Sequence, residues 1–213
     1  MLAVNSETGY VYLSHPFTDS LSVIDGKTNN IVNKSIKIGD QPNDIEVNLL
    51  SNQLYVTHPQ IGNISIIDLK HYVVTKSIKT NGSPYFIALN LNESKLYASN
   101  VKHNSVSVID LDGENYSIRD IGVGAEPTDI EFNPKNSLTY VINSRDNTIS
   151  VIDETKNIEK RIPTGQYPAS IEVNPTNNKV YVTNNKDNTV SVIDGTTNKE
   201  ITKIMVGHGP VGI

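Results

Sequence analysis

Short runs of β-branched and aromatic residues alternate with clusters of Asn, Asp, Gly and Pro along the whole chain. Near the end of the sequence, four such runs follow one another at residues 168–174, 179–184, 189–194 and 200–206. Each run is rich in Val, Ile, Thr or Tyr and is bounded by turn-forming residues, which is the pattern of short β-strands. No helical periodicity of useful length competes with it, so the pattern predicts an all-β fold.

The four-strand pattern recurs five times, with a period of 41 to 43 residues. An Asn closes each first strand, a Tyr follows seven residues later, and an Asp follows that Tyr by thirteen residues. All variation in length lies between this Asp and the Pro that opens the next copy. We therefore expect a single domain of five repeats, at about 1–41, 42–83, 84–126, 127–167 and 168–213.

Four strands in about 42 residues is the size of one β-propeller blade. Such a unit cannot bury its own faces and must stack on copies of itself. We predict a propeller of five four-stranded blades with two sets of side chains buried between them, one on the second strands and one on the third. The residues are Tyr55, Tyr97, Tyr140 and Tyr181, and Ile67, Ile109, Ile152 and Ile193.

The two ends of the chain lie at the same point of the repeat, because residues 210–213 align with residues 42–45. Residues 1–5 correspond to the end of a first strand and lack the apolar stretch of a signal peptide. The sequence is thus almost one circuit of five units. We favour a closed five-bladed ring, which would be monomeric, over an open segment of a larger, for example seven-bladed, propeller.

Composition narrows the possible partners. The chain of 213 residues has a net charge of −5 and no clustered basic run, which argues against nucleic acid as a ligand. It contains no Cys, which excludes disulfides, thiolate catalysis and Cys-ligated zinc. No apolar run approaches the 18 residues of a membrane span.

Two tetrapeptides of the last repeat carry a family resemblance. Residues 181–184 read Tyr-Val-Thr-Asn and residues 191–194 read Ser-Val-Ile-Asp. The chain resembles the YVTN β-propeller repeat family, and its other four copies stay in register with these motifs. The resemblance implies an extracellular or cell-surface propeller of the surface-layer or adhesion type. The residues alone leave the compartment open.

The loops that enter the first strands are the best place to look for a binding site. In a propeller the first strand lines the central channel, so these loops share one face with the turns between second and third strands. We call this the top face. The entering loops keep Gly and Pro as turn formers but differ at the other positions. Aromatic side chains there are typical contact anchors and polar ones supply orientation, although the same residues could simply cap the channel. The candidate binding residues are Asp44, Tyr85, Phe86, Glu126, Asp129, Tyr167 and His208.

Three histidines, His15, His58 and His103, are expected on the same face. One interpretation is a metal or acid–base site completed by Glu126 or Asp44. The other is that His15 and His58 replace the Asn found there in other repeats, since both residue types supply a hydrogen bond at a strand end.

The acidic residues at repeated positions can also be interpreted either as a ligand site or as part of the structure. Glu46, Glu131 and Glu172 on first strands could line an acidic channel, but Ala3 and Ala88 leave that ring incomplete. The Asp that ends each third strand precedes turn residues, and we expect its side chain to accept backbone N–H bonds.

We predict a non-catalytic binding or cell-surface structural module without a cofactor, taking a protein, small-molecule or glycan ligand on the top face. The alternative is a metal-dependent lyase-like enzyme that uses top-face His and Glu residues, by loose similarity to the virginiamycin B lyase propellers. No lyase motif matches residue by residue.

Overall fold

The protein, seen here as a computed structural model, is described for residues 1–113, 115–156 and 158–213. Five antiparallel sheets of four strands each follow one another in chain order, which confirms the all-β, five-blade prediction.

Each blade consists of four strands that are consecutive in the sequence. Blade 1 holds β1 (Leu2–Val4), β2 (Tyr10–His15), β3 (Ser20–Asp25) and β4 (Asn30–Lys37). Blade 2 holds β5 (Ile45–Asn48), β6 (Gln53–His58), β7 (Asn63–Asp68) and β8 (Val73–Lys79). Blade 3 holds β9 (Pro84–Asn90), β10 (Lys95–Asn100), β11 (Ser105–Asp110) and β12 (Ser117–Gly122). Blade 4 holds β13 (Pro127–Asn133), β14 (Leu138–Asn143), β15 (Thr148–Asp153) and β16 (Ile158–Pro163). Blade 5 holds β17 (Pro168–Asn174), β18 (Lys179–Asn184), β19 (Thr189–Asp194) and β20 (Lys199–Met205).

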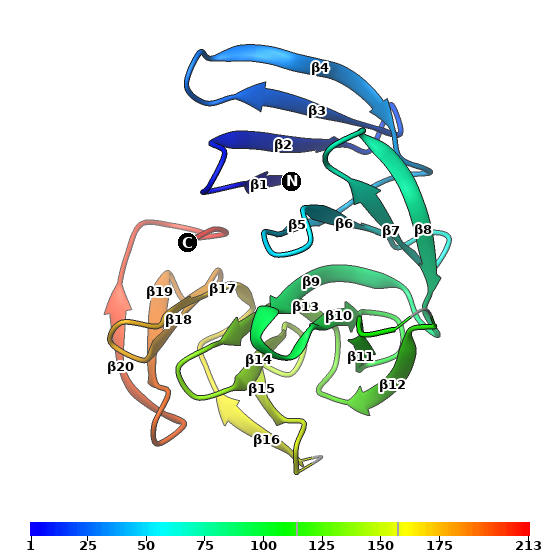
Figure 1. Cartoon of the computed structure of the whole chain (residues 1–213). Coiled ribbons are helices and arrows are strands. Elements are labelled where there is room, and N and C mark those ends of the chain that lie inside the picture. Colours follow the sequence, from blue (N-terminus) through cyan, green and yellow to red (C-terminus); the bar gives the residue numbers. More distant parts are fainter. Residues whose placement is uncertain (114, 157) are drawn as a thin grey trace.

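The blades are arranged around a common centre, with the first strand of each nearest to it and the fourth strand outermost (Figure 1). Extensive strand contacts among the described residues join only consecutive blades, most closely β13 with β9 and with β17. The closed five-bladed ring therefore remains a prediction from the sequence.

Among the described residues, one 3-10 turn, η1 (Leu91–Glu93), follows β9. These residues contain no helix with the length and apolar character needed to cross a membrane.

The turns at the face opposite the top are built by the repeated Asn and Asp residues. The Asn174 side chain accepts backbone N–H bonds from Thr176 and Asn177 at 3.0 and 3.4 Å. The Asp194 carboxylate does the same for Thr196 and Thr197 at 2.8 and 2.9 Å, and these bonds lower the pKa of Asp194. Each short polar side chain thus substitutes for a missing backbone partner, as expected from the sequence.

The hydrophobic core lies between the blades and repeats with them. In the first four blades, one face of the sheet carries the Tyr of the repeat and packs on the opposite face of the following sheet. Tyr55 thus lies in a cluster with Leu96 and Ile109 of blade 3, and Tyr140 lies with Val180 and Ile193 of blade 5. Because the three middle sheets are covered on both sides, their strands are apolar on both sides of the pleat.

The first and last blades differ from the three between them. Tyr181 is only half-buried, whereas Tyr55, Tyr97 and Tyr140 are at most 2% exposed. Tyr181 lies on the face of blade 5 against which no following blade packs extensively in the described residues, so it is not largely buried as predicted. On blade 1, Leu2 and Val4 are exposed on the corresponding opposite face. The four predicted Ile residues are all at most 1% exposed.

Candidate functional site

A buried hydrogen-bond frame holds the top face in place. In blade 5 the Asn184 side chain donates to Thr189 Oγ1 at 3.0 Å and Ser191 Oγ at 2.9 Å, and its Oδ1 accepts the N–H of Gly165 at 3.0 Å. The Asn therefore joins the second strand, the third strand and the entering loop. Asn100 and Asn143 make the corresponding bonds to Ser or Thr hydroxyls in blades 3 and 4.

In blades 3, 4 and 5 the entering-loop Gly is required by this frame and not by a left-handed backbone. A Cβ on Gly165 would lie 2.5 Å from Asn184 Cγ, which is closer than non-bonded carbon atoms approach. Gly82 and Gly124 meet Asn100 and Asn143 in the same way, at 2.3 and 2.4 Å. The sequence suggested only a turn former at these positions, because the contact is made between distant segments.

Two of the three candidate metal histidines belong to the same frame. His15 Nε2 lies 2.9 Å from Ser22 Oγ, and His58 Nδ1 lies 2.7 Å from the carbonyl oxygen of Asp40. Burial lowers the pKa of His58, which favours the neutral ring. His103 is exposed on the β10–β11 turn. The described residues contain no group of three or more His, Cys, Asp or Glu side chains placed to hold a metal ion.

The residue before the Pro of the entering loop adopts an unusual backbone in blades 4 and 5, and Gln41 does the same in blade 2. Glu126 and Tyr167 have φ of 55° and 54°, in the left-handed region that non-Gly residues rarely occupy. The side chain of Asn104 accepts the Glu126 N–H at 3.0 Å, and that of Asn147 accepts the Tyr167 N–H at 2.8 Å. Each bond runs from the preceding blade and holds the side chain of the left-handed residue outward.

These two residues line one hollow on the top face. Its volume is about 310 Å³, and it lies between blades 4 and 5. The lining comes from two entering loops and from the β14–β15 and β18–β19 turns. The lining residues are Glu126, Ser144, Arg145, Asn147, Gln166, Tyr167 and Lys186. Two of the seven predicted binding residues therefore meet in one hollow.

The hollow carries charges that do not neutralise one another. In the described parts of the chain, Glu126, Arg145 and Lys186 form no salt bridge. Lys186 Nζ lies 4.9 Å from the centroid of the Tyr167 ring, which is within the range of a cation–π interaction. Tyr167 is 45% exposed, so a ligand can reach the aromatic ring.

The other predicted aromatic residues lie apart from this hollow. The rings of Tyr85 and Phe86 are 5.9 Å apart at the loop entering blade 3, and Phe86 packs against the core between blades 3 and 4. Phe86 therefore has a structural role, whereas Tyr85 is 38% exposed. His208 is exposed in the loop after β20.

Asp44 and Asp129 tie consecutive blades together near the channel. Asp44 Oδ2 accepts the Ile87 N–H at 2.9 Å. Asp129 Oδ2 accepts the Ile171 N–H and the Ser170 hydroxyl, both at 2.9 Å. These bonds give both carboxylates a structural explanation, independent of any ligand.

The first-strand carboxyl groups have raised pKa values. Burial raises the pKa of Glu131 to about 9, and the nearby Glu172 and Glu46 carboxylates add to the effect. Burial and then the Asp44 carboxylate raise the pKa of Glu46 to about 7. Burial and then the neighbouring Asp129 carboxylate raise the pKa of Glu172. Near neutral pH, Glu131 is therefore protonated in the folded protein.

Stability should consequently fall as the pH rises. The pKa of Glu131 increases on folding, from 4.5 to about 9. Between these two pH values the folded state holds more protons than the unfolded state, so the free energy of unfolding decreases as the pH rises. Because Glu131 is partly exposed and solvent screens its charge, we expect Glu131→Gln to raise the free energy of unfolding at pH 9 by about 1–2 kcal/mol. At pH 4 the change should be small. Urea unfolding at both pH values measures this difference.

Glu7→Gln is the control, because Glu7 is exposed in the β1–β2 turn. It should change stability equally at the two pH values. A Glu131→Gln variant that is less stable than the parent at pH 9 would show that the folded protein favours the ionised carboxylate.

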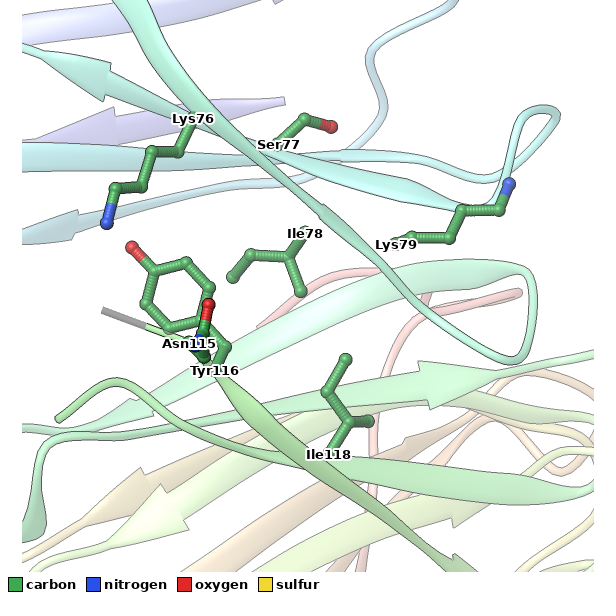
Figure 2. Close-up of a pocket in the computed structure, with 7 residues that line it drawn as sticks. All are labelled: Lys76, Ser77, Ile78, Lys79, Asn115, Tyr116 and Ile118. Atoms are coloured by element: carbon green, nitrogen blue, oxygen red, sulfur yellow. The ribbon is translucent and has the colours of Figure 1, made fainter. Parts of the chain in front are cut away.

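A hollow of about 380 Å³ lies on the outer rim and contains no predicted site residue. Figure 2 shows Ile78 from one fourth strand and Ile118 from the next facing the space between them, with Lys76 beside Tyr116. Another hollow lies between the fourth strands of blades 4 and 5. Both occur where neighbouring sheets diverge away from the centre, so blade geometry explains them.

Sequence reasoning missed the basic residues of the top-face hollow. Arg145 and Lys186 occupy the same repeat position, two residues after the frame Asn, and Lys102 occupies it in blade 3. Blades 1 and 2 carry Phe17 and Gln60 there. The basic series is visible in the sequence when the turns between second and third strands are aligned, whereas the entering loops carry no Lys or Arg.

No protein-family model matches the chain, and no curated protein matches it in sequence. Many solved structures share its fold. The structure of hydrazine synthase from Kuenenia stuttgartiensis has a TM-score of 0.71 at 23% identity, over 78% of this chain and 49% of that chain. The present chain thus spans about half the length of that structure.

Two further structures cover nearly the whole of this chain. A catalytically inactive virginiamycin B lyase from Staphylococcus aureus, with quinupristin, has a TM-score of 0.81 at 15% identity, covering 100% of this chain and 72% of that chain. A nidogen/laminin complex has a TM-score of 0.76 at 17% identity, covering 99% and 82%. Both neighbours are β-propellers. They include an enzyme and a protein-binding module, and at these identities they establish the fold alone.

Proposed function

We propose that the protein is a non-catalytic binding propeller of the YVTN-repeat kind, which holds a protein partner on its top face at the hollow between blades 4 and 5. The observation that carries the proposal is the placement of Glu126 and Tyr167. Both side chains are presented by left-handed backbone around one hollow. Backbone strain of this kind costs about 1–3 kcal/mol per residue and is found preferentially at functional sites.

The surrounding frame supports a rigid binding surface. Asn104 and Asn147 hold the two left-handed residues, and the frame Asn residues beneath them are buried. A preorganised surface loses little conformational entropy on binding. The exposed ring of Tyr167 has the character of an interface anchor. Family resemblance further suggests that the partner is met outside the cell or at its surface.

The lyase-like alternative would require the top-face histidines to act together with Glu126. Their positions favour the binding proposal, because His15 and His58 hydrogen-bond within the frame of blades 1 and 2. Glu126 lies at the hollow between blades 4 and 5.

Site-specific photocrosslinking tests the proposal. A benzoylphenylalanine at Gln166, in the hollow, should give a discrete adduct in an extract of the source cells. The same group at Thr176, which is exposed in the β17–β18 turn at the opposite face, should give none. Tyr167→Ala should reduce the Gln166 adduct by about tenfold, as expected for loss of an aromatic anchor. Equal adducts from both positions would refute a top-face site.

A further inference from the structure

Three consecutive blades carry an exposed basic residue on the top face although the chain as a whole is acidic. Lys102, Arg145 and Lys186 are exposed at the same turn position of blades 3, 4 and 5, whereas the net charge of the chain is −5. The hollow between blades 4 and 5 is lined by two of these cations and one carboxylate, Glu126, and exposed cations can select a partner of the opposite sign.

The acidic residues next to these cations are already engaged. Asp146 Oδ2 accepts the Ala125 N–H at 2.8 Å and lies 3.5 Å from Arg161 Nη1. Asp187 Oδ2 accepts the Gln166 N–H at 2.7 Å. Both carboxylates therefore stabilise the entering loops, and neither forms a salt bridge with Arg145 or Lys186 in the described chain.

We propose that the hollow between blades 4 and 5 binds an acidic segment of a protein partner, with a carboxylate of that segment held between Arg145 and Lys186. This inference rests on the proposed function and specifies its ligand class. An arginine guanidinium suits a carboxylate because its planar donors match the two oxygens. Lys186 is already oriented by its contact with the Tyr167 ring.

Glu126 adds a hydrogen-bond acceptor with a negative charge to the hollow. Its carboxylate lies on the same rim as the two cations and can accept N–H bonds from the backbone of the bound segment. A peptide offers both groups together, a side-chain carboxylate and main-chain N–H donors, whereas a simple anion offers only the first. The combination therefore favours an acidic peptide over a free inorganic anion.

Fluorescence anisotropy with defined peptides tests the inference. The probe is a labelled eight-residue peptide of alternating Glu and Ala, and its controls are the matching Gln/Ala peptide and inorganic phosphate as competitor. We expect the Glu peptide to bind at least about tenfold more tightly than the Gln peptide, the gain typical of hydrogen bonds to charged groups. Added NaCl should weaken binding, because exposed charges are screened.

Two charge-reversal variants locate the contact. The double variant R145E/K186E should lose at least about tenfold in affinity for the Glu peptide. The control K70E/K156E makes the same change in net charge at exposed positions of β7–β8 and β15–β16 turns, away from the top face, and should lose less than twofold. All these side chains are exposed, and circular dichroism checks that each variant remains folded.

Three outcomes would overturn the inference: no binding of the Glu peptide, equal binding of the Glu and Gln peptides, or equal losses in the two double variants. Displacement of the Glu peptide by phosphate at similar concentration would reassign the hollow to a simple anion. If the peptide fails while the Gln166 photocrosslink succeeds, the binding face stands and only the acidic ligand class is wrong.

Discussion

Replacing Ile109 by Ala is expected to lower the free energy of unfolding by about 2–5 kcal/mol. Ile109 is 0% exposed and lies on β11, where it packs with Tyr55 and Leu96 in the core between blades 2 and 3. Both sheets are held by backbone hydrogen bonds between all four strands, so the cavity left by the truncation cannot collapse freely. Urea unfolding followed by circular dichroism measures the loss.

Ile201→Ala provides the matched control on the outermost strand β20. Ile201 is 53% exposed, and surface substitutions usually change stability by less than about 0.5 kcal/mol. The same substitution therefore separates burial between blades from the intrinsic preference of Ile for a strand. A loss below about 0.5 kcal/mol at Ile109 would contradict its assignment to the interblade core.

Replacing Gly165 by Ala should lower stability by about 2–4 kcal/mol, although it adds only one methyl group. The new Cβ would lie 2.5 Å from Asn184 Cγ. Relieving that overlap must displace the Asn184 side chain, which donates to Thr189 and Ser191. The substitution thus disturbs both the packing and the buried hydrogen bonds of the top face. Thermal and urea unfolding measure the effect.

A double-mutant cycle identifies the cause. Asn184→Ala alone should cost about 1–3 kcal/mol, because it leaves buried hydroxyl groups unsatisfied. Combined with Gly165→Ala it should cost clearly less than the sum, since removing the Asn side chain makes room for the methyl group. Gly122→Ala is the matched control, because no other heavy atom lies within 4 Å of its added Cβ. Additive losses at 165 and 184 would show that the steric contact is not the reason for the glycine.

The architecture could be predicted because five independent copies of the repeat indicate the same strands. The spacing of the repeated Asn, Tyr and Asp residues is the same in all five copies, so each copy predicts the same four strands. In the last copy, the predicted first three strands coincide with β17, β18 and β19, and the fourth differs from β20 by one residue at each end. Tyr181 was the exception, since its burial depends on a neighbouring sheet and not on its own strand.

The site was only partly predictable. Comparing the entering loops identified Glu126 and Tyr167, which line the hollow, because side chains that differ between repeats are free of the repeat's structural constraints. The same comparison also selected Asp44 and Asp129, whose carboxylates hydrogen-bond across to the next blade. A polar residue that differs between repeats can serve either a ligand or one particular blade interface, and sequence alone does not separate the two.

The sequence by itself determined the strands, their order, the five-fold repeat and the identity of all the predicted core residues except Tyr181. Those properties follow from local alternation of apolar and turn-forming residues, which each repeat specifies independently. The tertiary structure decided which loops meet. It brought Arg145, Tyr167 and Lys186 around one hollow, and it placed Gly165 against Asn184. These contacts join residues from different strands or blades, and their closeness depends on the angle and distance between packed sheets, which no local pattern encodes.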